Sequence, residues 1–289
     1  ISIDIKKLKA TAKDDISITN KSHLKLSSII SENQGTITIV SKEGSIVANE
    51  NTGTYSPYHI NGGDVILKAV NGQIGTSENN LKFANKGTFY VQAKGDVYLD
   101  SASTIYADLI ASTQGALTVN ADLGIIASAI TDENRVYNLA SKGDMNLTSA
   151  TGNIENITVN ADGTVNAIAG YDTNGAVSGL SDVNITMASQ KQLSNDSTEA
   201  EISAFNETAK DLKIGTIKAS NNVTLTGEKG IKNASDSSFV SGERIAINAA
   251  GDIGTEDSAI DLTANREVTV IGSENSNIYL TTSDEEKGL

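Results

Sequence analysis

The chain has 289 residues and a formal net charge of −14, from 22 Lys and Arg against 36 Asp and Glu. This balance excludes the basic surface that nucleic-acid binding requires and disfavours adsorption to an anionic membrane. The sequence also has no Cys and no Trp, which excludes disulfides, thiolate catalysis and Cys-based metal sites.

Most of the chain consists of short segments in which apolar residues alternate with Thr, Asn or Ser. Such alternation, bounded by Gly or Asn, predicts half-buried β-strands. No segment has a strong helical period, so the sequence predicts an all-β fold. In chain order, the clearest alternating pairs are Ile16 and Ile18, Ile37 and Ile39, Val65 and Leu67, Val97 and Leu99, Leu117 and Val119, Met145 and Leu147, Val183 and Ile185, Val223 and Leu225, and Ile245 and Ile247.

A Gly and a short polar or small residue stand before many of these segments. Such pairs begin at Gly95, Gly115, Gly143 and Gly163, which are 20, 28 and 20 residues apart. A meander of hairpins would place turns about every 8–12 residues. Steps near 20 residues instead predict a solenoid, a parallel β-helix of about 20-residue coils with loop insertions. A β-sandwich stalk domain is the alternative architecture.

One turn motif occurs twice, and the apolar pattern after it is repeated. The motif is NGQIGT at residues 71–76 and AGDIGT at residues 250–255. The first four apolar offsets after Gly75 recur after Gly254. This matched spacing indicates one structural unit used repeatedly, and we expect the motif to form the corner that closes one coil and starts the next.

No linker or low-complexity segment interrupts the chain. We therefore expect residues 1–289 to form a single β-solenoid segment of a larger protein. The widest gap in the strand pattern separates Val183 from Val223. It predicts an irregular insertion around residues 190–210.

Residues 63–76 (GDVILKAVNGQIGT) and 212–231 (LKIGTIKASNNVTLTGEKGI) resemble the repeat region of filamentous-haemagglutinin-like bacterial adhesins. The resemblance extends over nearly the whole chain. It implies a right-handed parallel β-helix, a secreted or cell-surface location and an adhesive or stalk role. It also implies export through an outer-membrane transporter partner, as in two-partner secretion. The Asn-Pro-Asn motifs of that family's secretion domain are missing, since Pro57 is the only Pro. The resemblance therefore places the segment in the downstream rod.

The sequence predicts no catalytic residue, no cofactor and no metal site. The histidines, His23 and His59, have no catalytic partner at a recognisable spacing, and we interpret both as surface or strand-edge residues. Because some parallel β-helices are polysaccharide lyases or hydrolases, such an enzyme is the alternative function. Its candidate carboxylates share a repeat position at the starts of strands and are expected to align in space: Asp96, Asp144, Asp182 and Asp252. We interpret them as turn residues.

Two loops are the candidate contact regions. One contains Tyr55, Tyr58 and His59, and the other contains Tyr171. Tyr and His on protruding loops are typical contact residues. The expected partner is a host or bacterial surface receptor or a glycan. Self-association into filaments is a further expectation, because open solenoid ends expose unpaired strand edges.

Overall fold

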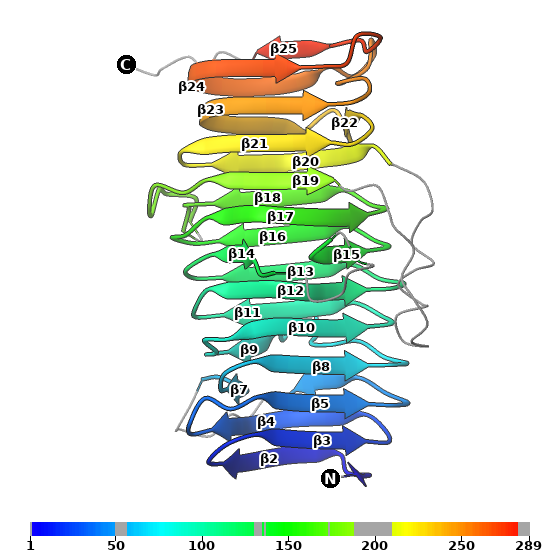
Figure 1. Cartoon of the computed structure of the whole chain (residues 1–289), viewed down its shortest axis with the longest axis vertical. Coiled ribbons are helices and arrows are strands. Elements are labelled where there is room, and N and C mark those ends of the chain that lie inside the picture. The colour runs from blue at the N-terminus through cyan, green and yellow to red at the C-terminus, as the bar shows by residue number, and fades with distance from the viewer. Residues whose placement is uncertain are drawn as a thin grey trace.

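The computed structural model describes residues 2–49, 57–129, 135, 137–172, 174–187 and 210–282. These residues form one sheet of 25 strands that winds around a long axis (Figure 1). Every pairing between named strands is parallel, with partners contributed by successive coils. The parallel pairing confirms the predicted β-solenoid and excludes the β-sandwich alternative. The predicted insertion around 190–210 lies outside the described residues except for Lys210.

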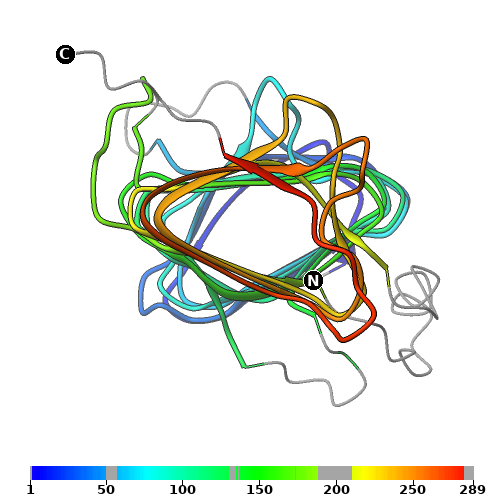
Figure 2. The ribbon, with the colours of Figure 1, turned by 90° about the horizontal axis from the view of Figure 1, so that it is seen from above.

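Each coil crosses two faces, and Figure 2 shows them as the long sides of a flattened ring. Face A, turned toward the viewer in Figure 1, is built from β1 (Ser2–Ile3), β3 (Ile16–Asn20), β5 (Ile37–Ser41), β8 (Val65–Ala69), β10 (Thr88–Ala93), β12 (Ile105–Ser112), β14 (Ile125–Ala127), β15 (Leu139–Ser141), β17 (Ile154–Ala161), β19 (Val183–Met187), β21 (Asn222–Gly227) and the second halves of β23 (Phe239–Ala249) and β24 (Ile260–Ile271).

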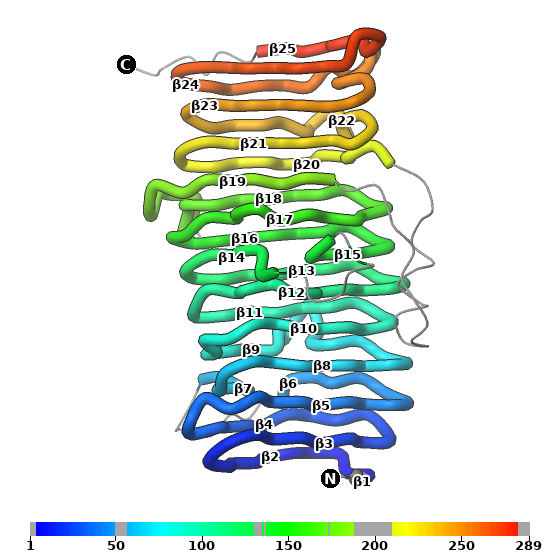
Figure 3. Tube along the Cα trace, in the orientation of Figure 1, coloured from blue at the N-terminus to red at the C-terminus, as the bar shows by residue number. Residues whose placement is uncertain are grey.

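Face B lies behind. It is built from β2 (Lys7–Ala12), β4 (Leu24–Ser31), β6 (Ile46–Ala48), β7 (Ile60–Asn61), β9 (Leu81–Phe83), β11 (Val97–Ser101), β13 (Leu117–Ala121), β16 (Met145–Ser149), β18 (Val165–Ala169), β20 (Leu212–Ala219), β22 (Ile231–Asn233), the first halves of β23 and β24, and β25 (Leu280–Thr282). The strands of face A run from left to right as the chain rises, so the coil is right-handed (Figures 1 and 3).

Coil length varies because loops are inserted between strands. Paired residues are separated by as few as 17 positions, as for Ser2 and Thr19. The largest separation, 50 positions, joins Ala167 to Ile217. The stack therefore keeps its register while the sequence period changes, since insertions leave the ring between strands (Figure 2). Among the described residues, no helix is long and apolar enough to cross a membrane.

The core lies between the two faces and is made of apolar columns. Ile39, Leu67 and Val91 occupy successive coils of face A, and all three are fully buried. Alternate residues point outward and are largely polar, as the period-2 pattern predicts. Phe83 and Phe89 form an edge-to-face pair with ring centroids 5.2 Å apart. Apart from Met145 and Met187, the rest of this core consists of Ile, Val, Leu and Ala, which suit thin, repeated layers.

Both copies of the repeated motif form the same corner. Gly75 and Gly254 each have a φ of 71°, in the left-handed region that favours glycine. A Cβ at Gly75 would lie 2.3 Å from the carbonyl oxygen of Tyr98, and one at Gly254 would lie 2.4 Å from that of Tyr279. The motif thus marks a turn over which the next coil passes at close range, and the prediction that it encodes a corner is confirmed.

Candidate functional site

The four carboxylates that were candidates for the enzyme alternative do not form a cluster. Asp96, Asp144 and Asp252 lie at the corner that leads from face A to face B, whereas Asp182 lies at the opposite corner. The Oδ1 atoms of these residues accept backbone N–H groups from the coil above: Asp96 from Ala116 at 2.8 Å, Asp144 from Thr164 at 2.9 Å, Asp182 from Asn222 at 2.9 Å and Asp252 from Asn277 at 2.7 Å. The expectation that all four align was wrong, and their hydrogen bonds tie each coil to the next.

His59 is part of the ladder rather than a protruding contact residue. It is only 3 % exposed, and its backbone pairs with Ile29 on one side and Lys82 on the other. Its Nδ1 accepts the backbone N–H of Lys82 at 3.0 Å. Burial lowers the pKa of His59, and the nearby charge of Lys82 lowers it further, against a hydrogen bond to the Asn49 backbone that raises it. The neutral imidazole is therefore a structural acceptor.

The remaining contact residues have different positions. Tyr55 lies outside the described residues, and Tyr58 is half-buried just before β7. Tyr171 begins a short hairpin, paired with Val177, whose turn is closed by hydrogen bonds to the Asp172 carboxylate. The Nζ of Lys218 lies 3.9 Å from the centroid of the Tyr171 ring. That contact connects the hairpin to the outer surface of face B.

A hollow lies on that same face, near the C-terminal end. It has two halves of about 430 and 280 Å³ that share Asp236, Ser238 and Asp261. We call it the face B groove. Its first half is also lined by Asn233, Asp257, Ser258, Ala259, Thr281 and Thr282, and its second half by Lys218, Ser237, Phe239, Ser241 and Thr263. The carboxylates, hydroxyls and one aromatic ring suit a polar ligand.

Two loops shape this groove. Residues 234–238 connect β22 to β23, and residues 254–259 precede β24 one coil higher. The Asn233 side chain joins them, because its Nδ2 donates to the Ala259 carbonyl at 2.6 Å. The floor is the outer surface of β23 and β24, where Phe239 pairs with Asp261. Sequence reasoning missed this site, although alternation with the inward Val240 already indicated that Phe239 points outward.

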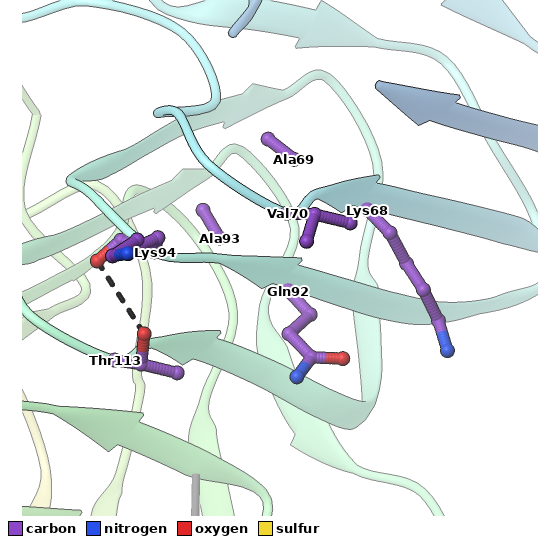
Figure 4. Close-up of a pocket in the computed structure, with 7 residues that line it drawn as sticks. All are labelled: Lys68, Ala69, Val70, Gln92, Ala93, Lys94 and Thr113. Carbon is purple, nitrogen blue, oxygen red and sulfur yellow. Dashed lines mark hydrogen bonds between the residues drawn. The ribbon is translucent and has the colours of Figure 1, made fainter. Parts of the chain in front are cut away.

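A second hollow, at the end of β8 and β10, is too small for a ligand. It is lined by Lys68, Gln92, Lys94 and Thr113 together with three apolar residues (Figure 4). Its volume is about 10 Å³, the space of about one water molecule. The Thr113 hydroxyl donates to the Lys94 carbonyl at 3.5 Å across it. We interpret it as a packing gap beside a corner.

A small polar and aromatic cluster covers the outside of face A. Arg135 forms a buried ion pair with Asp108, and its guanidinium lies 5.9 Å from the Tyr90 ring centroid. The fully buried Tyr137 packs there against Leu109. These side chains fill the space between face A and the part of the chain that carries Arg135 and Tyr137. We therefore interpret the cluster as a packing contact rather than a binding site.

Three lysines surround Asp162 at the corner before β18. Lys142 lies 2.8 Å from its carboxylate, and Lys210 also pairs with it. Lys213 donates to its carbonyl at 3.5 Å. Burial, then the charges of Lys142 and Lys213, lower the pKa of Lys210 to about 8. These residues come from successive coils, so the cluster joins the coils on both sides of the long connection to β20.

No group of three His, Cys, Asp or Glu side chains that could hold a metal ion occurs within the described residues. No protein-family model, curated protein or solved structure matches this chain. The face B groove is therefore the candidate site on its geometry alone.

Proposed function

We propose that this chain is a rod segment of a secreted or cell-surface bacterial exoprotein, with a structural and adhesive role. The observation that carries the proposal is the continuous parallel ladder from β1 to β25. At about 4.8 Å for each coil, the face A column from β1 to β24 spans about 50–55 Å. Backbone hydrogen bonds along that length stiffen the stack, so that it holds a binding region away from its anchor.

The bacterial surface location and the export through an outer-membrane transporter rest on the resemblance to filamentous-haemagglutinin-like adhesins. The charge of −14 supports a solvated rod, since like charges along it oppose side-by-side aggregation. Self-association of the rod into filaments is part of the same proposal.

The contact region of this adhesive rod is the face B groove together with the Tyr171 hairpin. Exposed Val177 and Leu180 follow Tyr171 in that hairpin, and Lys218 links it to the groove. The test is a binding screen of the purified chain against glycans and host-matrix proteins, in parallel with a Tyr58→Ala/Tyr171→Ala variant. We expect retained fold and reduced binding in the variant. Binding that is equal in both proteins would remove the Tyr residues from the proposal.

A polysaccharide lyase or hydrolase is the second candidate function. Three carboxylates, those of Asp236, Asp257 and Asp261, line the face B groove, as such chemistry requires. Asp236 and Asp257 are exposed to solvent, whereas catalytic electrostatics is strongest in a site that excludes water. Binding is thus favoured over catalysis. Release of reducing sugar or unsaturated product from a glycan panel, abolished by Asp261→Asn, would reverse that preference.

A further inference from the structure

The floor of the face B groove holds an outward aromatic ring. Phe239 occupies a column in which its neighbours in adjacent coils are Thr216 and Asp261. The other two described phenylalanines, Phe83 and Phe89, are fully buried. A half-exposed ring at a position that Thr occupies one coil below loses apolar burial. It offers in return a flat face on which the C–H side of a sugar ring can stack.

The groups around that ring accept hydrogen bonds at several separate points. Asp236 and Asp261 line both halves of the groove, and Ser238 between them is only 3 % exposed. The Oδ1 of Asn233 is buried and has no hydrogen-bond partner within the described residues. No three carboxylates converge closely enough for a metal ion in that part of the chain. A matching ligand therefore carries several donors spread along its length.

The charge of the groove distinguishes among such ligands. Asp236, Asp257 and Asp261 contribute three negative charges, and Lys218 is the one cation among the lining residues. Lys218 also lies over the Tyr171 ring. In a chain of charge −14, this surface repels uronate and sulfated glycans and attracts ammonium groups.

We propose that the face B groove binds a glycan that carries free amino groups. Its sugar rings stack on Phe239, its hydroxyls donate to the carboxylates, and its ammonium groups pair with Asp236 and Asp261. The proposal rests on the adhesive function proposed above and names the class of its ligand. An amino-glycan is favoured over a cationic peptide because one sugar unit combines a flat C–H face for the Phe239 ring with hydroxyl donors and an ammonium group.

The experiment compares three probes by calorimetry at mildly acidic pH: deacetylated chitosan oligomers, the same oligomers fully N-acetylated, and oligolysine of matched charge. We expect the deacetylated oligomer to bind at least about fivefold more tightly than either of the others, because each exposed ion pair contributes only a modest free energy. Added salt should reduce this advantage. Equal binding of the N-acetylated oligomer or of oligolysine overturns the proposal, and so does the absence of binding.

Variants test the residues. Asp261→Asn should weaken binding of the deacetylated oligomer about fivefold and leave the N-acetylated one nearly unchanged. Phe239→Thr, which copies Thr216 one coil below, should weaken both. Asp122→Asn is the matched control, since Asp122 is an exposed corner carboxylate remote from the groove. An equal effect in the control contradicts the proposal. Thermal unfolding checks that each variant folds.

Small-angle scattering of the same samples separates this inference from the function on which it rests. An elongated particle that does not bind the amino-glycan contradicts only the ligand. A compact particle contradicts the rod itself, whatever the calorimetry shows.

Discussion

The carboxylate of Asp96 accepts the backbone N–H of Ala116 at 2.8 Å, across the step from one coil to the next. The two residues occupy the same corner position 20 residues apart. In the same way, the Asp144 carboxylate accepts the Thr164 N–H and, at the opposite corner, the Asp15 carboxylate accepts the Thr36 N–H. A carboxylate at the start of a strand thus satisfies the backbone donor that the turn of the next coil would otherwise leave without a partner.

Replacement of this carboxylate should cost stability. Asp96→Ala removes a charged acceptor from a backbone donor, which we expect to lower the free energy of unfolding by about 1–2 kcal/mol. Asp96→Asn keeps an acceptor and should cost less. Urea unfolding followed by circular dichroism measures both. Asp122→Ala is the control, because that carboxylate has no hydrogen bond or ion pair within the described residues, and it should change stability by less than about 0.5 kcal/mol. An equal loss in the control would show that corner charge, not the hydrogen bond, is responsible.

Two glycines with similar φ angles but different surroundings distinguish the cost of a steric clash from the cost of backbone strain. Gly75 and Gly175 have φ angles of 71° and 81°. A Cβ at Gly75 would lie 2.3 Å from the Tyr98 carbonyl oxygen, whereas one at Gly175 would have nothing within 4 Å.

Gly175→Ala should therefore cost only the strain of a left-handed alanine, about 1–2 kcal/mol. Gly75→Ala should cost more than that, because the next coil must move away. The measurement is the urea midpoint of each variant. Equal midpoints for the two variants would show that the corner at Gly75 accommodates the added methyl group without a further loss of stability.

Stability should fall in acid through His59. Its pKa in the folded chain is lowered, mainly by burial, so the folded state binds fewer protons than the unfolded state as the pH falls below the ordinary value of 6.5. The stabilisation is therefore complete above that value and is lost as the pH falls toward the folded pKa.

His59→Asn places an amide oxygen where Nδ1 accepts the Lys82 N–H and removes the titrating group. We expect its unfolding midpoint to change less than that of the parent chain between about pH 7 and pH 5. The exposed His23 serves as the control, and His23→Asn should keep the parent pH profile. If the unfolding midpoint of His59→Asn depended on pH as strongly as that of the parent chain, the acid sensitivity would belong to other groups.

Neighbouring residues of β8 test the alternation of the coil. Leu67 is fully buried between Ile39 and Val91, and Leu67→Ala should cost about 2–5 kcal/mol through the cavity it leaves. Ile66 points outward and is half-buried, so Ile66→Ala should cost about 1 kcal/mol. Chemical unfolding of the pair gives both values. A larger loss at Ile66 would contradict the assigned register.

The strand pattern and the corners were predictable because they are local. Leu117 and Val119 alternate with Thr118 and Asn120, and the pleat turns that alternation directly into one buried and one outward-facing surface. Gly75 and Gly254 were correctly matched from spacing alone, since a left-handed corner restricts its residue to glycine in both copies. The role of Asp96 as a turn residue also followed from its position beside Gly95.

The face B groove was not predictable in the same way. Its walls come from residues near 236 and 257, and its end contact joins Tyr171 to Lys218 across 47 positions. Insertions of unequal length separate these residues, so no fixed spacing in the chain indicates that they meet. The same irregularity placed Asp182 at the opposite corner from Asp96, although both precede a strand in the same manner.

By itself, the sequence determined that this protein is a stack of short strands with glycine corners, because alternation and turn chemistry act within a few residues. The tertiary structure alone decided which corner each carboxylate occupies, that His59 is a buried acceptor, and that two loops and an outward Phe239 enclose a groove. The physical reason is that parallel stacking brings whole coils into register at about 4.8 Å, whatever number of residues each loop inserts between them.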